Sequence, residues 1–174
     1  MGVFNQNTGV CGLGELGMGY AGNLHNQICS DFTHQLKTEY KRRFQISQDI
    51  TIHTIRSYKY PDVSIWEWND QTELIKPFVL IEIADVSNIT NAKKAADNSL
   101  ESNPTLQECF IYYFSYNVWF RKLKNETKYQ IATYSPILHK DLNELYLNCE
   151  VKGNIDREAK KRQRPYNLDG PSLI

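Results

Sequence analysis

The chain has 174 residues, 20 basic and 20 acidic side chains, and a mean hydropathy of −0.54. This length fits one domain around one hydrophobic core, and the composition is that of a globular protein rather than a disordered one. No apolar run approaches the ~18 residues that a membrane helix needs. Because the formal charge is zero, any binding of nucleic acid must come from a local basic patch.

Residues 1–22 are rich in glycine and asparagine. The spacing Gly12-x-Gly14-x-x-Gly17 is similar to that of a phosphate-binding loop. We do not predict such a loop, because no strand precedes these glycines and no Gly-Lys-Ser/Thr ending follows them. The segment also lacks the basic and apolar regions of a secretory signal. We therefore expect a flexible leader and a cytoplasmic protein.

An apolar side chain recurs at every fourth residue between Asn23 and about Arg43, which predicts an amphipathic helix. The repeat consists of Leu24, Ile28, Phe32, Leu36 and Tyr40. At about 100° per residue, Glu39 falls about 20° from Ile28, inside the apolar stripe. The Glu39 side chain then either faces inward or bends out to water or to a neighbouring lysine or arginine.

Two strands follow, one with isoleucines at positions 50, 52 and 55 and one over residues 63–66. Residues 69–72 predict a turn, and residues 78–83 form a near-continuous apolar run that is typical of a central, buried strand. Asp62 and Glu82 are therefore expected on neighbouring strands.

A helix is predicted from Thr90 to Leu100 and a buried strand from Cys109 to Phe114, an order that usually gives a right-handed crossover between parallel strands. Residues 119–123 and 129–134 predict two further strands that extend the sheet in antiparallel orientation. Residues 141–147 predict a short helix. We expect a single domain over residues 23–150 and a loose, polar, basic tail over residues 151–174.

The four cysteines, at positions 11, 29, 109 and 149, include no C-x-x-C pair. Zinc-binding and disulfide frameworks are therefore not expected. We expect free cysteines that act as small core residues.

Asp62 and Glu82 lie in apolar, strand-forming runs, and Lys93 and Lys94 follow on the predicted helix. An ionised carboxylate in a core costs several kcal/mol unless it is paired or bound to a cation. Two such acids indicate a divalent cation. The alternatives are that Asp62 only begins a strand or caps a turn, that Glu82 pairs with Lys94, and that both lysines lie on a solvated helix face.

Several of these residues together resemble the PD-(D/E)XK nuclease superfamily, and most closely the short bacterial restriction-endonuclease-like proteins whose lysine has moved onto the following helix. The resemblance covers residues 24–138. The matching segments are Pro61-Asp62-Val63, Glu82 within Val79–Ile83, Lys94, and Glu108-Cys109-Phe110-Ile111.

This resemblance implies a mixed α/β fold, a restriction-endonuclease-like core with a mixed central β-sheet flanked by helices. It also implies a metal-dependent endonuclease that hydrolyses DNA phosphodiesters. Asp62 and Glu82 would bind Mg²⁺ or Mn²⁺, Lys94 or Lys93 would be the catalytic cation, and Glu39 would help.

The chain departs from the family pattern at three positions. Ala84 stands where the usual lysine would follow the second acid, Asp85 where a serine is common, and Asn91 where an acid usually precedes the helix lysine. Ala84 and Asp85 favour an alternative, a catalytically inactive nuclease-fold protein that acts as a DNA-binding or assembly module. A third alternative is a partner-binding protein in which Glu82 and Lys94 form only an ion pair.

Basic side chains gather in two places, near aromatic residues, and this combination suits a nucleic-acid backbone. The basic residues are Lys37, Lys41, Arg42 and Arg43, then Arg121, Lys122 and Lys124; the aromatic residues are Tyr58, Tyr60, Trp66, Tyr112, Tyr113 and Trp119. We expect DNA as the partner, without membrane association, and allow for a homodimer. The alternative is that the aromatics pack the core and the charges are solvated.

Overall fold

The computed structural model describes residues 18–41, 43–49, 52–53, 58–59, 61–67, 76–145 and 147–162. The elements, in chain order, are α1 (Met18–Tyr40), β1 (Phe44–Gln48), β2 (Ile52–His53), β3 (Tyr58–Lys59), β4 (Val63–Glu67), β5 (Val79–Ala84), α2 (Ile89–Ser102), β6 (Glu108–Tyr113), β7 (Val118–Leu123), β8 (Gln130–Ile131), β9 (Tyr134–Ser135), β10 (Lys140–Asp141), the 3-10 helix η1 (Leu142–Glu144) and α3 (Cys149–Arg162).

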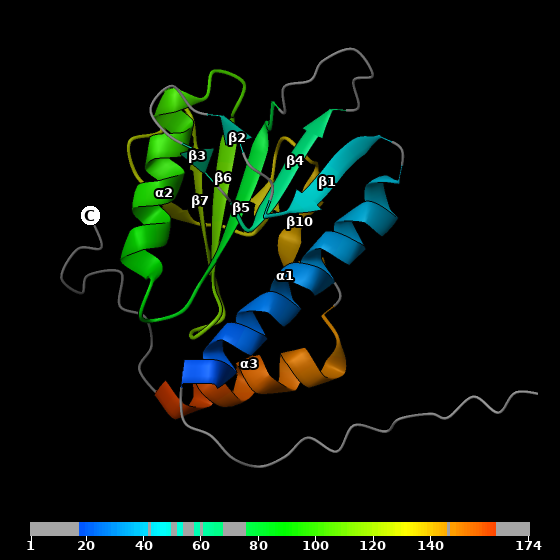
Figure 1. Cartoon of the computed structure of the whole chain (residues 1–174), viewed down its shortest axis with the longest axis vertical. Coiled ribbons are helices and arrows are strands. Elements are labelled where there is room, and N and C mark those ends of the chain that lie inside the picture. The colour runs from blue at the N-terminus through cyan, green and yellow to red at the C-terminus, as the bar shows by residue number, and fades with distance from the viewer. Residues whose placement is uncertain are drawn as a thin grey trace, which may run out of the picture.

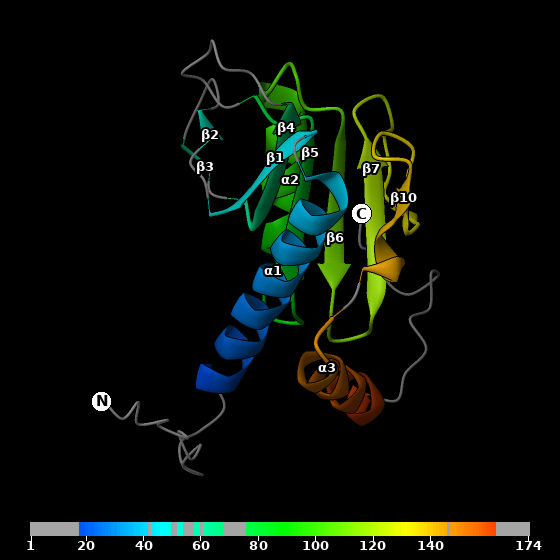
Figure 2. The same ribbon diagram turned by 90° about the vertical axis from the view of Figure 1, so that its right-hand side faces the viewer.

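A six-stranded mixed sheet lies at the centre of the molecule, in the order β1-β4-β5-β6-β7-β8. Strands β5 and β6 are parallel and are joined through α2, whereas the other neighbouring pairs are antiparallel. Helices α1 and α2 lie on opposite sides of this sheet, and α3 lies beside the first part of α1 (Figures 1 and 2). The expected mixed α/β fold, with its parallel crossover, is therefore confirmed.

Strand β5 contributes to both apolar layers of the molecule. Val79, Ile81 and Ile83 pack into the cluster under α1, and Leu80 and Ala84 pack into the cluster under α2. The sequence of a strand that is covered on both faces is a nearly continuous apolar run, as it is in β5. Because side chains alternate along a strand, Glu82 belongs to the α2 side.

Helix α1 presents the predicted apolar stripe to the sheet, with Leu24, Ile28, Phe32 and Leu36 all at most 2% exposed. It begins at Met18, five residues earlier than expected, and ends at Tyr40. Lys41 then takes a left-handed backbone conformation (φ 43°), and its N–H bonds to the Lys37 carbonyl, which is a common way to end a helix. The rest of the predicted leader, residues 1–17, lies outside the described residues.

The first strand of the sheet was not expected from the sequence. We predicted a strand at residues 50–55, but β1 covers Phe44–Gln48 and pairs antiparallel with β4. Phe44 and Ile46 are buried against α1, whereas the polar residues between and after them are partly exposed. Such alternation is typical of a strand with one buried face. Residues 52–53 form only a short hairpin with 58–59, and Ile50 and Ile55 lie outside the described residues.

The prediction of a loose tail is wrong for residues 151–162, which belong to α3. Val151 and Ile155 are buried in the cluster under α1, so a short apolar stripe is enough to dock this otherwise polar helix. Asn148 caps the helix, because its side-chain oxygen accepts a hydrogen bond from the Glu150 N–H at 2.8 Å. Residues 163–174 lie outside the described residues.

Cys29 and Cys109 are buried and free, which confirms the expected core role for these two thiols. Within the described part of the chain, no helix combines the length and the apolar character needed to cross a membrane.

Candidate functional site

Asp62 lies one residue before β4, next to the backbone of β5. Its Oδ2 accepts a hydrogen bond from the Ile83 N–H at 2.6 Å. The Ile83 nitrogen lies about 2.4 Å from the Cα of Glu82, the preceding residue. Together with the hydrogen bond, this places Asp62 Oδ2 within about 5 Å of the Glu82 Cα. Extending the β4–β5 register by one pair from Val63 and Ile81 also sets Asp62 opposite Glu82. The fold therefore brings these two predicted acids to neighbouring backbone positions.

The second oxygen of Asp62 faces helix α1. Asp62 Oδ1 lies 3.2 Å from His25 Nε2, and the two side chains are 15% and 25% exposed, respectively. This hydrogen bond is the main reason why the pKa of His25 rises from 6.5 to about 11, which keeps the imidazole protonated at neutral pH. Asp62 is thus held by two partners, one from the sheet and one from α1.

The Glu82 side chain is partly exposed, and the strand alternation directs it toward α2. Its charge helps to raise the pKa of the Cys109 thiol and of the Tyr129 hydroxyl, although burial is the main cause for both groups. Glu82 therefore contributes negative charge to the layer between the sheet and α2, whereas the Asp62 carboxylate contacts α1.

The two adjacent lysines of α2 have different surroundings. Lys93 is partly buried, with its Nζ 4.9 Å from the ring centre of Phe120 and 5.2 Å from that of Tyr129, and burial lowers its pKa. Lys94 is exposed. A step of about 100° per residue turns Lys94 away from the face that buries Ala92 and Ala96. The structure therefore places Lys93, and not Lys94, on the sheet side of α2.

Glu39 does not join the other predicted residues. It lies 14 residues after His25 on the same helix, which is about 21 Å along the helix axis. Its side chain is 50% exposed, and its Oε1 lies 3.7 Å from Lys140 Nζ. Of the two directions expected for Glu39, the structure shows the outward one: the carboxylate keeps its hydration at the helix end and pairs with Lys140.

The basic residues expected to contact DNA on β7 and beyond are engaged within the protein. Lys122 Nζ lies 2.8 Å from Asp97 Oδ1, Lys124 Nζ donates to the Asn103 carbonyl at 2.7 Å, and Arg121 lies 3.6 Å from Glu126. The aromatic rings at 112, 113 and 119 are at most 5% exposed and belong to the core. Trp66 is partly exposed, and the side chains of residues 58 and 60 lie outside the described residues.

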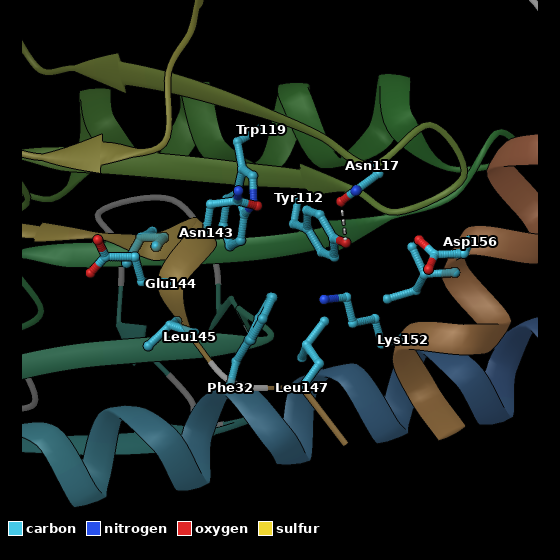
Figure 3. Close-up of a pocket in the computed structure, with 12 residues that line it drawn as sticks. Phe32, Tyr112, Asn117, Trp119, Asn143, Glu144, Leu145, Leu147, Lys152 and Asp156 are labelled. Carbon is cyan, nitrogen blue, oxygen red and sulfur yellow. Dashed lines mark hydrogen bonds between the residues drawn. The ribbon is translucent and has the colours of Figure 1, made fainter. Parts of the chain in front are cut away.

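A cavity of about 400 Å³ lies between α1, α3, η1 and the β6–β7 pair (Figure 3). Its floor is formed by Phe32, Tyr112 and Trp119, and the Tyr112 hydroxyl donates a hydrogen bond to Asn117 Oδ1 at 2.9 Å. The Lys152 amine points into it from α3 (Figure 3). None of the predicted catalytic or metal-binding residues lines this cavity, so the acids and the cavity are separate features.

Sequence reasoning did not select His25. A single histidine on an amphipathic helix carries little signal, and only its spacing of four residues from Cys29 hinted at a shared helix face. Its partner Asp62 comes 37 residues later, so only the packing of α1 on the sheet brings the two together.

Solved structures include several chains that resemble this one. No model of a protein family matches the chain, and no curated protein matches it. A crystal structure from Anabaena variabilis ATCC 29413, described as a "putative nuclease belonging to DUF820", superposes with a TM-score of 0.59 at 17% sequence identity, over 79% of this chain and 80% of that one. At this identity the likeness establishes the fold, and the chain has a nuclease-like fold, a mixed central sheet flanked by helices.

Proposed function

We propose that the chain is a metal-dependent nuclease of the PD-(D/E)XK type that hydrolyses phosphodiester bonds in DNA. The observation that carries the proposal is the anchoring of the Asp62 carboxylate on the Ile83 N–H, next to the backbone of Glu82. Because Asp62 contacts α1 and Glu82 belongs to the α2 side, a shared ion would lie between them at the start of β4. The nuclease-like fold supports the same proposal, because Asp62 just before β4 and Glu82 on β5 belong to two neighbouring central strands of this sheet.

The donor set fits a magnesium or manganese ion. Mg²⁺ prefers oxygen ligands and usually takes one or two protein carboxylates together with water and substrate phosphate oxygens. Asp62 and Glu82 offer those carboxylates, and the Ile83 N–H would fix the orientation of Asp62 as an outer-shell partner. When bound, such an ion would supply positive charge for the phosphate and a water of lowered pKa.

Lys93 is the cation that we assign to this site. It lies on the sheet side of α2, as Glu82 does, whereas Lys94 faces solvent. An ammonium group in a partly buried position can neutralise the charge that develops on a phosphate, and it acts more strongly there than in water. His25 has a positioning role, because its ring holds Asp62 Oδ1 from the α1 side.

Cleavage of supercoiled plasmid DNA with Mg²⁺ or Mn²⁺ tests the proposal. Glu82→Gln should lower the rate at least about a hundredfold, since a ligand of the ion is worth several kcal/mol. The metal should also raise the melting temperature of the wild-type protein and not that of Glu82→Gln. Cleavage by Glu82→Gln at the wild-type rate would contradict the proposal.

The two lysines provide a matched pair of variants. Lys93→Met should lose cleavage activity about tenfold or more, whereas Lys94→Met should cleave within about twofold of the wild-type rate. Both variants remove one positive charge from the same helix, so the general attraction of DNA changes equally. Equal rates for the two variants would rule out the role of Lys93.

A second candidate function is DNA binding without cleavage, by a nuclease-fold protein that has lost activity. Two observations favour it. Ala84, at the usual lysine position, is fully buried. Asp85, where a serine is common, shapes the turn before α2 by accepting hydrogen bonds from the N–H groups of Ser87 and Asn88 at 2.8 and 3.1 Å. Metal-independent binding of DNA, without cleavage under any metal, would support this candidate.

A further inference from the structure

Three side chains with metal-binding atoms converge where α1 crosses the start of β4. His25 and Cys29 lie one helical turn apart, with Cys29 Sγ 3.7 Å from His25 Nδ1 and 4.0 Å from Nε2. Asp62 Oδ1 completes the group at 3.2 Å from His25 Nε2. Among the described residues, this is the one set of three such side chains whose ligand atoms all lie within 4.8 Å of one another.

The separation of His25 Nε2 and Asp62 Oδ1 matches one edge of a small coordination tetrahedron. Zinc binds histidine nitrogen at about 2.0–2.1 Å, carboxylate oxygen at a similar distance and thiolate sulfur at about 2.3 Å. Tetrahedral angles then require about 3.3 Å between nitrogen and oxygen and about 3.6 Å between nitrogen and sulfur. The nitrogen–oxygen distance of 3.2 Å agrees with this geometry. Cys29 Sγ lies at nearly equal distances from both ring nitrogens and therefore beside the ring, so the His25 ring has to turn about its side-chain bonds before Nε2 and Sγ can share one ion.

The surroundings orient two of the three ligands. His25 Nδ1 lies 3.3 Å from Asn26 Oδ1, and a hydrogen bond there holds the ring proton on Nδ1 and leaves Nε2 to face Asp62. The Ile83 N–H holds Asp62 Oδ2 and leaves Oδ1 to face His25. Cys29 is only 3% exposed, whereas His25 and Asp62 are 25% and 15% exposed, so the cluster is open to solvent on one side.

We propose that His25, Cys29 and Asp62 form a three-ligand site for a borderline-soft divalent cation, with Zn²⁺ as the best match. A thiolate beside an imidazole selects such ions over Mg²⁺ and Ca²⁺, which prefer oxygen ligands. Three protein ligands leave a fourth position for water or another molecule. Binding requires the thiolate and the neutral imidazole, so the ion displaces one proton from each group.

This site does not depend on the proposed nuclease activity, although the two share Asp62. An ion held by His25 and Cys29 draws Asp62 Oδ1 toward α1. Glu82 belongs to the nuclease site alone, and Cys29 to the zinc site alone. Variants of these two residues therefore separate the two proposals.

Cobalt(II), a spectroscopic substitute for zinc, provides the test. The full chain is prepared reduced, with Cys11→Ser and Cys149→Ser, so that only the two buried thiols remain. We expect one Co²⁺ per chain, with the absorption band of sulfur-to-cobalt charge transfer, and loss of that band when Zn²⁺ is added. Cys29→Ser should abolish the band. His25→Gln should weaken binding at least about tenfold, the loss that even outer-shell partners cause.

Two variants serve as controls. Cys109→Ser removes the other buried thiol, on the α2 side, and should keep the band. Glu82→Gln should keep the band while losing cleavage activity. Cys29 is buried, and its variant can misfold. His25→Gln, at a partly exposed position, is therefore measured in parallel. Circular dichroism verifies the folding of both variants, and native mass spectrometry counts the bound zinc.

Either of two results would overturn the proposal. The first is a chain that binds no zinc or cobalt stoichiometrically, in which case His25 and Asp62 form only an ion pair. The second is a charge-transfer band that persists in folded Cys29→Ser. A wild-type chain that shows the band but cleaves no DNA would contradict the nuclease proposal and leave the zinc site standing.

Discussion

Asp62 and Glu108 are two acids beside apolar strands of the same sheet, but their surroundings differ. Asp62 lies near the Ile83 end of β5 and keeps 15% exposure, and each of its oxygens has a partner, the Ile83 N–H and the His25 ring. Glu108 lies near the Val79 end, is fully buried, and accepts a 2.5 Å hydrogen bond from Ser135 on one oxygen. Its other oxygen has only the Arg121 Nε at 3.9 Å.

This difference separates Asp62, the proposed metal ligand, from Glu108, a structural acid. Burial raises the pKa of Glu108 from 4.5 to about 7, because Ser135 and Arg121 offset only part of the cost of desolvation. A carboxylate that is this buried cannot reach a substrate. An acid in an apolar strand is therefore not by itself the mark of a catalytic site, and accessibility decides between the two roles.

The largest expected effect is on cleavage, where the two acids should differ by orders of magnitude. Asp62→Asn should lower the rate about a thousandfold, equivalent to about 4 kcal/mol, because it removes a proposed ligand of the ion. Glu108→Gln should cleave within a few fold of the wild-type rate once its folding has been verified. Plasmid nicking under saturating Mg²⁺ measures both rates. Equal losses in the two variants would remove the distinction between them.

The next effect is the dependence of stability on pH. Between pH 4.5 and about 7 the folded chain keeps the Glu108 proton and the unfolded chain releases it, so the free energy of unfolding should fall as pH rises through this range. The fall contributed by Glu108 is on the order of 3 kcal/mol. Urea unfolding from pH 4.5 to 8 should show a flatter profile for Glu108→Gln. Glu101→Gln, which alters an exposed acid on α2, should keep the wild-type slope.

A smaller effect is expected at the hydroxyl that supports Glu108. Ser135 Oγ donates to Glu108 and accepts the Leu138 N–H at 3.0 Å, so Ser135→Ala leaves two buried groups without this partner. The loss should be about 1–3 kcal/mol in the free energy of unfolding. The pKa of Glu108 should also rise further, which shifts the pH profile upward. Thr38→Ala, at an exposed hydroxyl on α1, should change stability by less than about 0.5 kcal/mol.

The smallest effect is expected for Glu39, the exposed acid at the end of α1. Glu39→Gln removes a half-exposed ion pair with Lys140 and should change the free energy of unfolding by at most about 0.5 kcal/mol. Its cleavage rate should equal that of the wild-type protein. A loss of activity in this variant would restore the role that the structure denies to Glu39.

The sequence by itself determined the elements whose signals are local. The apolar run at residues 78–83, the helix before Asn103-Pro104 and the strand from Cys109 predicted β5, α2, β6 and their parallel crossover, because strand and helix periodicities and their breakers act within a few residues. The apolar repeat of α1 predicted its buried face in the same way. Strand β1 and helix α3 were missed, since each has too few apolar residues to stand out from its polar surroundings.

Only the tertiary structure decided how the chemical groups are combined. Asp62 meets His25 and Cys29 because α1 packs on the strands around β4, and no local pattern encodes a contact across more than thirty residues. The choice of Lys93 over Lys94 followed from the rotation of α2 on the sheet, and the outward direction of Glu39 from the position of Lys140. Periodicity gives an element its apolar face, but the partners of a polar side chain are fixed only when distant elements pack together.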